Sequence, residues 1–346
     1  MEMEPLTPPV IGALPAGARN SITDVAGVTV GHCTLDDGDV QTGVTVVRPH
    51  AGNVYLQKVP AACAVINGFG KSIGLVQVEE LGVLETPIAL TNTFAVGAVA
   101  HAQICEAVAA NPEIGRSLPT VNPLVFECND GYLNDIQAMA VDRVHYETAC
   151  AAACADVQAG SVGAGRGMSS FGVKGGIGTA SRLVGGYCVG ALVLANFGTP
   201  ESLVIAGRQV GGELAARLAA PAPEPEKGSI IMILATDAPL DARQLRRLAL
   251  RAGAGLARTG SVYGHGSGDI VFAFSTAYTV PHHAAEPMPS VPLLHESRLD
   301  PLFRAAADSV EQAILHALWQ AVPVHGRSGH RRQALLDVMP ELRTPI

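Results

Sequence analysis

Residues 229–236 read Ser-Ile-Ile-Met-Ile-Leu-Ala-Thr and form the most strand-like run of the chain. An unbroken apolar run of this length is typical of a strand that is buried on both faces. A helix is expected next, because apolar residues recur every three or four positions from Leu245 to Leu256 and Asp241 is suited to cap it. Residues 269–276 predict another buried strand. This strand–helix–strand order predicts a layered α/β fold, with buried sheets lying between helices.

The rest of the chain carries similar signals and no internal repeat. Short β-rich runs that end at Gly, Pro or Asn predict strands at 25–30, 42–47, 61–66, 87–91 and 189–195. Residues 94–110 predict a helix, because small apolar residues recur without Pro until Asn111-Pro112. A last long helix is expected to have Asp300 as its cap and Pro301 at its first helical position. Its buried stripe is predicted to be Leu302, Ala306, Val310, Ile314 and Leu318.

Composition argues against several classes of protein. The 346 residues are 48% hydrophobic and 16% charged, with a net charge of −8. There is no Lys/Arg-rich run for a phosphate backbone, so we expect no nucleic-acid partner. No unbroken apolar stretch of about 18 residues occurs, so we expect no membrane span. Seven cysteines without a C-x-x-C pair, and a start (MEMEPLTPPV) unlike a secretory signal, predict a cytoplasmic enzyme with free thiols.

Residues 219–228, Ala-Ala-Pro-Ala-Pro-Glu-Pro-Glu-Lys-Gly, mark the sharpest shift in composition. The alternating prolines predict an extended, solvated segment that lies in neither sheet nor helix interior. A domain boundary explains the segment as well as an exposed linker does. If the chain were cut after Gly228, Ser229 would carry a free α-amine, whose reference pKa is about 7.7–8.0. Such an amine is able to activate the hydroxyl beside it without a histidine, and glycine before the serine permits the strained backbone of an N→O acyl shift. Gly-Ser before a strand is also a common turn.

Other motifs point more weakly to chemistry. Gly163-Ala-Gly165 and Gly176-Ile-Gly178 lack the G-x-G-x-x-G spacing of a dinucleotide site, and tight backbone approach is the better interpretation. His282-His283 lies in a Pro-bounded loop, where solvated side chains are more typical than metal ligands. There is no G-x-S-x-G elbow, so the common serine-hydrolase layout is absent.

Several segments between about residues 19 and 276 match one family pattern in order. They are 20–32, 127–135, 160–165, 174–182, 195–198, 228–231, 258–261 and 266–269. Together they resemble the DmpA-type aminopeptidases, the L-aminopeptidase/D-amidase-esterase and β-aminopeptidase family. The resemblance implies a four-layer αββα sandwich, with two mixed sheets between helices. It also implies a precursor that cuts itself into residues 1–228 and 229–346, two intertwined parts of one domain that assemble as a homotetramer of processed pairs.

The same resemblance implies roles for individual residues, without a metal or cofactor. Ser229 would be the nucleophile and its amine the base, with Asn196 donating to the oxyanion. Tyr132 would line the site, and Glu127 would bind the ammonium group of the substrate. Ser267 and Asp269 would hold the amine and hydroxyl of Ser229. The substrate would be a small peptide, or an amino-acid amide or ester, that loses one amino-terminal residue: a small L-residue, a D-residue or a β-amino acid.

The chain departs from the family pattern in places. Asp269 stands where β-aminopeptidase relatives have Glu, so its contact is expected to shift or to run through water. His265 replaces a small polar residue, and we expect an exposed loop histidine there. For Asp130, Asn134 and Asp135, we expect turn-satisfying polar groups rather than catalytic ones.

Three alternatives stay open at this point. One is an amide-oligomer hydrolase of the same fold, whose nucleophile is typically Thr. Another is an acyltransferase similar to ornithine acetyltransferase, which also cleaves itself before a Thr. The last is an uncleaved binding protein that kept the fold without the chemistry.

Overall fold

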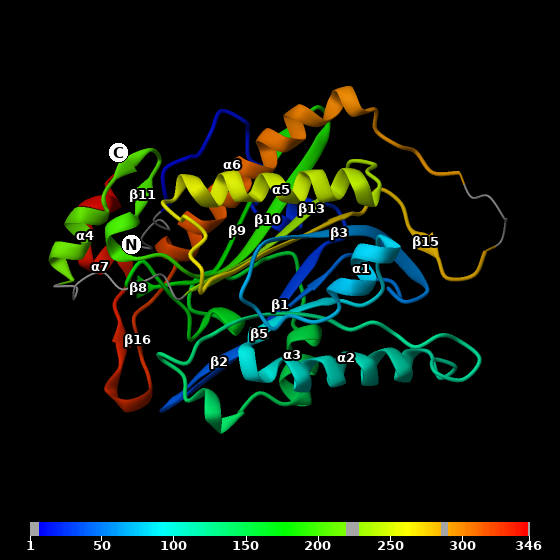
Figure 1. Ribbon diagram of the computed structural model, residues 1–346, viewed down its shortest axis with the longest axis horizontal. Coiled ribbons are helices and arrows are strands. Elements are labelled where there is room, and N and C mark those ends of the chain that lie inside the picture. Colours follow the sequence, from blue (N-terminus) through cyan, green and yellow to red (C-terminus); the bar gives the residue numbers. More distant parts are fainter. Residues whose placement is uncertain (1–6, 219–227, 285–289, 345–346) are drawn as a thin grey trace.

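The computed structural model describes residues 7–218, 228–284 and 290–344. In this part of the chain the principal strands form a four-stranded and a seven-stranded sheet. Helices cover the outer face of each sheet, as Figure 1 shows, with α5 and α6 on one side of the molecule and α2 and α3 on the other. The α/β fold with mixed sheets between helices that the sequence predicts is therefore confirmed.

The four-stranded sheet has the order β1-β2-β5-β6. Its strands are β1 (Thr29–Asp37), β2 (Val40–Arg48), β5 (Ile88–Asn92) and β6 (Leu124–Cys128). Strands β5 and β6 are parallel and the other neighbours are antiparallel. The parallel pair brings the carboxyl ends of β5 and β6 to the same edge, where Thr91 lies opposite Glu127.

The seven-stranded sheet has the order β15-β3-β14-β13-β10-β9, with β4 pairing with β3. Its strands are β3 (Gln57–Gly68), β4 (Val83–Leu84), β9 (Gly176–Val184), β10 (Tyr187–Asn196), β13 (Ser229–Thr236), β14 (Gly268–Ser275) and β15 (Val280–Pro281). Strand β13 lies centrally, antiparallel to β10 and parallel to β14. All eight of its residues are buried, as its unbroken apolar pattern predicts.

Three layers of apolar side chains hold the sandwich together. One cluster lies between the sheets and includes Ile231 and Ile233 of β13 with Leu90 and Phe126 of the other sheet. A second cluster packs the opposite face of the seven-stranded sheet against α5 and α6. A third packs α2 and α3 on the four-stranded sheet. Because β13 contributes to two of these layers, the segments before and after residues 219–227 build one core.

Helices and minor strands complete the fold. The helices are α1 (Leu75–Leu81), α2 (Val96–Ala110), α3 (Arg143–Ala151), α4 (Gly211–Arg217), α5 (Ala242–Arg258), α6 (Leu299–Trp319) and α7 (Leu335–Val338). Two-residue strands pair as β7 (Ser169–Ser170) with β8 (Val173–Lys174), β11 (Val204–Ile205) with β12 (Arg208–Gln209), and β16 (Val324–His325) with β17 (Arg331–Arg332).

Two boundaries differ from the sequence predictions. The strand predicted at 25–30 begins only at Thr29, because a 3-10 turn at Ile22–Asp24 carries Val25 and Val28 into the core as loop residues. The N-cap position of helix α6 is Arg298 rather than Asp300, since the preceding 3-10 turn runs directly into the helix, and the Arg298 side chain makes no capping hydrogen bond. Asp300 instead lies in the first turn, where a carboxylate still favours the helix dipole.

Other helix predictions are confirmed. Asp241 caps α5 through a reciprocal pair of hydrogen bonds with Gln244. The predicted stripe of α6, Leu302 to Leu318, is buried throughout.

The helical segment Thr93–Ala110 is long enough and apolar enough to cross a membrane, judged by length and composition alone. In the fold, this segment packs Val96, Val99 and other residues into the cluster on the four-stranded sheet. The Pro/Glu-rich linker falls mostly on 219–227, outside the described residues.

Candidate active site

Ser229 is the first residue of β13, and strand pairing fixes its neighbours. It lies opposite Asn196 in the antiparallel ladder with β10 and opposite Gly268 in the parallel ladder with β14. The Gly268 N–H donates to Oγ of Ser229 over 3.1 Å. The hydroxyl is therefore held at the end of a buried central strand, with 8% of the residue exposed.

Gly228 precedes this serine in a confined space. A Cβ added at Gly228 would lie 2.3 Å from the carbonyl oxygen of Asn196 and 2.5 Å from Cα of Phe197. Lack of room for a side chain therefore accounts for a glycine at this position.

The carboxamide of Asn196 is fixed in one orientation. The Ser169 N–H donates to its Oδ1 over 2.8 Å, and its Nδ2 donates to the carbonyl oxygen of Asn129 over 3.0 Å. An amide N–H only donates and a carbonyl only accepts, so the two ends of the carboxamide are not interchangeable. Nδ2 carries two hydrogens, and the second is left to donate to a group bound beside Ser229.

Ser267 and Asp269 flank the glycine that contacts Ser229. The Ser267 hydroxyl donates to Oδ1 of Asp269 over 2.6 Å, and both residues are fully buried. The hydrogen bond to the Ser229 hydroxyl comes from the Gly268 N–H between them. In the uncut chain the Ser267 hydroxyl thus contacts Asp269, and the backbone N–H between them holds the nucleophile, whereas their role toward a free Ser229 amine stays a prediction.

Glu127 ends β6 close to this strand end. The Lys71 N–H donates to its Oε1 over 2.7 Å, and the Thr93 hydroxyl donates to its Oε2. A Cβ added at Gly70 would lie 3.6 Å from this Oε1 and 3.9 Å from Cα of Gly268, so Gly70 separates the carboxylate from the nucleophile strand. Only 3% of Glu127 is exposed, and no Lys or Arg pairs with it in the described part of the chain. A buried carboxylate without a cation favours a bound ammonium group.

Tyr132 lies further out, with 40% of the residue exposed. Its ring stacks on His330, with centroids 4.6 Å apart, and the guanidinium carbon of Arg332 lies 3.8 Å from the ring. Tyr132 follows Asn129 in the turn that accepts the Asn196 hydrogen bond. The structure therefore gathers Ser229, Asn196, Ser267, Asp269 and Glu127 at one end of the sheets, with Tyr132 on a turn that borders them.

Sequence reasoning missed Lys174, whose side chain contacts the glycine-rich loop that includes Gly165 and Gly175. Its Nζ donates to the carbonyl oxygens of Gly165, Met168 and Gly175, at 2.7–2.8 Å, and the residue is fully buried. Burial lowers the pKa of this ammonium well below its ordinary value, with nearby Arg166 acting in the same direction. Three carbonyl acceptors match its three donors. Lys174 thus fixes the loop whose Ser169 orients Asn196.

Asp130 belongs to the other loop that holds Asn196. It is buried, and its Oδ1 accepts from Nδ2 of Asn134 over 3.0 Å. Burial raises the pKa of this carboxyl to about 7, against hydrogen bonds and the Lys174 charge that lower it. Asn134 satisfies the turn, since its Oδ1 accepts from the Gln41 N–H. Asp130 was expected only to satisfy the turn; a nearby buried lysine was not visible in its sequence surroundings.

The weaker motifs adopt structural roles. Gly163 and Gly165 form a 3-10 turn, and a Cβ at either would lie within 2.6 Å of a neighbouring atom, as tight packing predicts. His265 is an exposed loop residue. His282 follows β15 and stacks on Tyr55.

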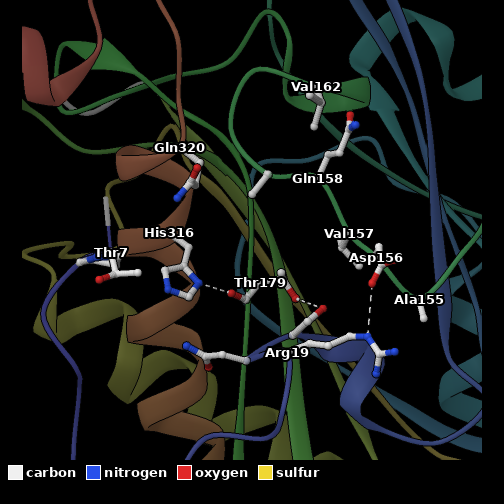
Figure 2. Close-up of a pocket in the computed structure, with 14 residues that line it drawn as sticks. Thr7, Arg19, Ala155, Asp156, Val157, Gln158, Val162, Thr179, His316 and Gln320 are labelled. Atoms are coloured by element: carbon white, nitrogen blue, oxygen red, sulfur yellow. Dashed lines mark hydrogen bonds and ion pairs between the residues drawn. The ribbon is translucent and has the colours of Figure 1, made fainter. Parts of the chain in front are cut away.

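A separate pocket of about 810 Å³ lies between the start of the chain, β9 and the end of α6 (Figure 2). Arg19 pairs with Asp156 across one side, and His316 contacts the carbonyl oxygen of Thr179 on the other. Burial lowers the pKa of His316, which leaves it uncharged at neutral pH. None of the predicted catalytic residues is among those that line this pocket in the described part of the chain.

Comparison with known proteins agrees with this geometry. The model of Peptidase family S58 matches residues 20–332. The chain belongs to peptidase family S58. The beta-peptidyl aminopeptidase BapA of Sphingosinicella microcystinivorans, a similar protein, is 39% identical over 348 residues, covering 92% of this chain and 86% of that protein. The family resemblance expected from the sequence is confirmed.

Similar solved structures extend the comparison to the fold of nearly the whole chain. The PH0078 protein from Pyrococcus horikoshii OT3 has a TM-score of 0.90 and 48% identity, covering 96% of this chain and 97% of that one. The L-aminopeptidase D-Ala-esterase/amidase from Ochrobactrum anthropi, a prototype serine aminopeptidase, has a TM-score of 0.88 and 35% identity over 96% of each chain. It is a variant of the N-terminal-nucleophile (Ntn) hydrolase fold. This chain is accordingly an Ntn serine aminopeptidase of family S58.

Proposed function

We propose that this S58 member cuts its own chain before Ser229 and then removes single amino-terminal residues from short peptides. The observation that carries the proposal is the position of Ser229, whose hydroxyl is held at the start of a buried strand beside the oriented amide of Asn196. Self-cleavage begins when Oγ attacks the Gly228 carbonyl and the C–N bond breaks, which leaves an ester and a free α-amine. Water then hydrolyses the ester to a Gly228 carboxylate and restores the Ser229 hydroxyl.

The liberated amine supplies the base for peptide hydrolysis. It accepts the Oγ proton as Oγ attacks the scissile carbonyl, and the second N–H of Asn196 Nδ2 donates to the resulting oxyanion. The protonated amine then gives its proton to the departing amine, so an acyl-enzyme ester remains. Water, deprotonated by the same amine, hydrolyses this ester and frees Ser229.

Glu127 supports a requirement for a free amino terminus. Its buried carboxylate has hydrogen-bond donors on both oxygens but, among the described residues, no cationic side chain as a partner, which suits an ammonium group. The substrate is proposed to begin with a small L-residue or a β-amino acid, or to be a D-amino acid amide or ester. Relatives named for β-peptidyl and for L-aminopeptidase D-Ala-esterase/amidase activity support this range.

Substitution of Ser229 tests the proposal. Purified protein should run as two bands near 23 and 12 kDa, scaled from 35.6 kDa for the full chain. Ser229→Ala should give one full-length band and no hydrolysis. Ser275→Ala, at the opposite end of β14, removes a buried serine of the same sheet and should leave both reactions in place. A wild-type protein that stays full-length would favour the uncleaved binding protein instead.

A substrate panel separates the enzymatic alternatives. Amides of L-Ala, β-Ala and 6-aminohexanoate distinguish an aminopeptidase from an amide-oligomer hydrolase, and acetyl transfer from N-acetylornithine to glutamate tests for an acyltransferase. We propose a homotetramer of processed pairs, to be checked by light scattering. A cytoplasmic location is also proposed, supported by seven free cysteines.

A further inference from the structure

The hairpin of β16 and β17 is cationic in a chain of net charge −8. Residues 324–332 read Val-His-Gly-Arg-Ser-Gly-His-Arg-Arg, with three arginines, two histidines and no acidic residue. Such a local concentration of positive charge favours an anionic group nearby.

This hairpin is seated on the turn that carries Tyr132. The Arg327 Nε donates to the Gly131 carbonyl oxygen over 2.6 Å, and the Arg327 N–H donates to that of Leu133 over 2.8 Å. A Cβ added at Gly326 would lie 1.9 Å from the same Leu133 oxygen, so glycine is needed for this close approach. The hairpin is therefore held against the border of the site.

Arg332 reaches from this hairpin toward the oxyanion donor. Its Nε donates to Oγ of Ser169 over 3.3 Å, and the Ser169 N–H donates to Asn196 over 2.8 Å. The guanidinium carbon also lies 3.8 Å from the Tyr132 ring. The Tyr132 ring and Ser169 thus hold the guanidinium in place, and Ser169 links it to the Asn196 side chain through two successive hydrogen bonds.

The Arg332 guanidinium has no carboxylate partner among the residues that the structure describes. Among the described residues, no Asp or Glu forms an ion pair with Arg332, whereas exposed arginines such as Arg243 and Arg247 share Glu296. Arg332 is partly buried, and this burial lowers its pKa. Within the described part of the chain, only the Nε of this side chain donates a hydrogen bond, so the terminal nitrogens are left to bind a carboxylate through two parallel N–H groups.

We propose that Arg332 binds the C-terminal carboxylate of a short peptide substrate, opposite the amino-terminal pocket of Glu127. This subsite rests on the proposed aminopeptidase function and defines its substrate class as short peptides with a free carboxyl end. In a dipeptide, the carboxylate carbon lies within about 4 Å of the scissile carbon, so it stays near the oxyanion donor. The Glu127 carboxylate and the Arg332 guanidinium, neither of which has an ion-pair partner among the described residues, then complement the two ends of a zwitterion.

Matched dipeptides test this subsite. Alanyl-alanine and β-alanyl-alanine are compared with their C-terminal amides, which keep the amino end and scissile bond but lose the negative charge. The unaltered enzyme should hydrolyse the carboxylate forms with the higher kcat/KM. Arg332→Gln should raise KM for the carboxylate forms by about 10- to 100-fold, the range for a lost charge-assisted hydrogen bond, and leave the amides within threefold.

Two variants serve as controls. Arg331→Gln removes the adjacent, exposed arginine and should change neither substrate class, since successive strand residues point to opposite faces. Arg332→Lys keeps the charge and should restore part of the loss. Equal losses on carboxylates and amides, or no carboxylate preference in the unaltered enzyme, would overturn the subsite. Absence of turnover on every substrate with a free amine would instead contradict the proposed function itself.

Discussion

Asn196→Asp replaces one donor with an acceptor and keeps the shape of the side chain. One carboxylate oxygen would still accept from the Ser169 N–H, but the other would face the Asn129 carbonyl oxygen, now 3.0 Å from Nδ2. Two acceptors in contact repel each other. The Nδ2 hydrogen that would donate to the oxyanion is also lost, and the introduced carboxylate places a negative charge beside the position where the oxyanion forms.

The expected loss follows from these contacts. Removal of one oxyanion donor costs about 3–4 kcal/mol of barrier, or about 10²- to 10³-fold in kcat. KM should change much less, because the ammonium end of the substrate binds at Glu127. Self-cleavage is an acyl transfer at the same serine, so its rate, followed by denaturing gel, should fall with peptide hydrolysis. Rates are normalised to the amount of processed chain.

Asn196→Ala is the matched variant, since it removes the donor without adding charge. It should lose a similar factor in kcat, and Asn196→Asp should be no faster. A kcat within threefold of wild type in processed Asn196→Asp protein would refute the assignment of Asn196 as the oxyanion donor.

Three further predictions concern the groups around the site. Gly228→Ala should block or strongly slow self-cleavage on denaturing gels, because its Cβ would meet the Asn196 carbonyl oxygen at 2.3 Å; normal processing would contradict the steric argument. Lys174→Met removes one donor from three buried carbonyls, of which those of Gly165 and Met168 keep a backbone N–H donor, so we expect a cost of about 1–3 kcal/mol in all and a fall in both the urea unfolding midpoint and kcat. An unchanged kcat would show that this loop does not position Asn196. Asp130, with its pKa raised from 3.8 to about 7, stabilises the fold most below pH 4, and this stability is lost as the pH rises through 7. Between pH 5 and pH 8 the loss is about 3 kcal/mol, and it should be absent in Asp130→Asn when urea unfolding is measured at both pH values.

Local patterns in the sequence predict much of the framework. The unbroken apolar run of Ser229–Thr236 predicts a doubly buried strand, and the three-to-four spacing after Asp241 predicts α5 with its cap. Both features depend on residues close in sequence. The predicted start of α6 was wrong by two residues, because the 3-10 turn before it continues into the helix and places Arg298 at the N-cap position.

Features that depend on tertiary pairing were harder to predict. Strand register sets Ser229 opposite Asn196 and Gly268, and no local pattern reveals that register. The roles of these residues came from family resemblance. Lys174 escaped notice because a lysine in a glycine-rich segment is ordinarily solvated, whereas three carbonyls from the folded loop enclose it here.

N-terminal sequencing of the purified protein tests the central claim most directly. The account predicts a fragment that begins Ser-Ile-Ile-Met with a free amine, and enzymatic activity that rises with the fraction of this fragment. A fully active protein that remains one uncut chain, or whose serine carries a blocked amine, would contradict it.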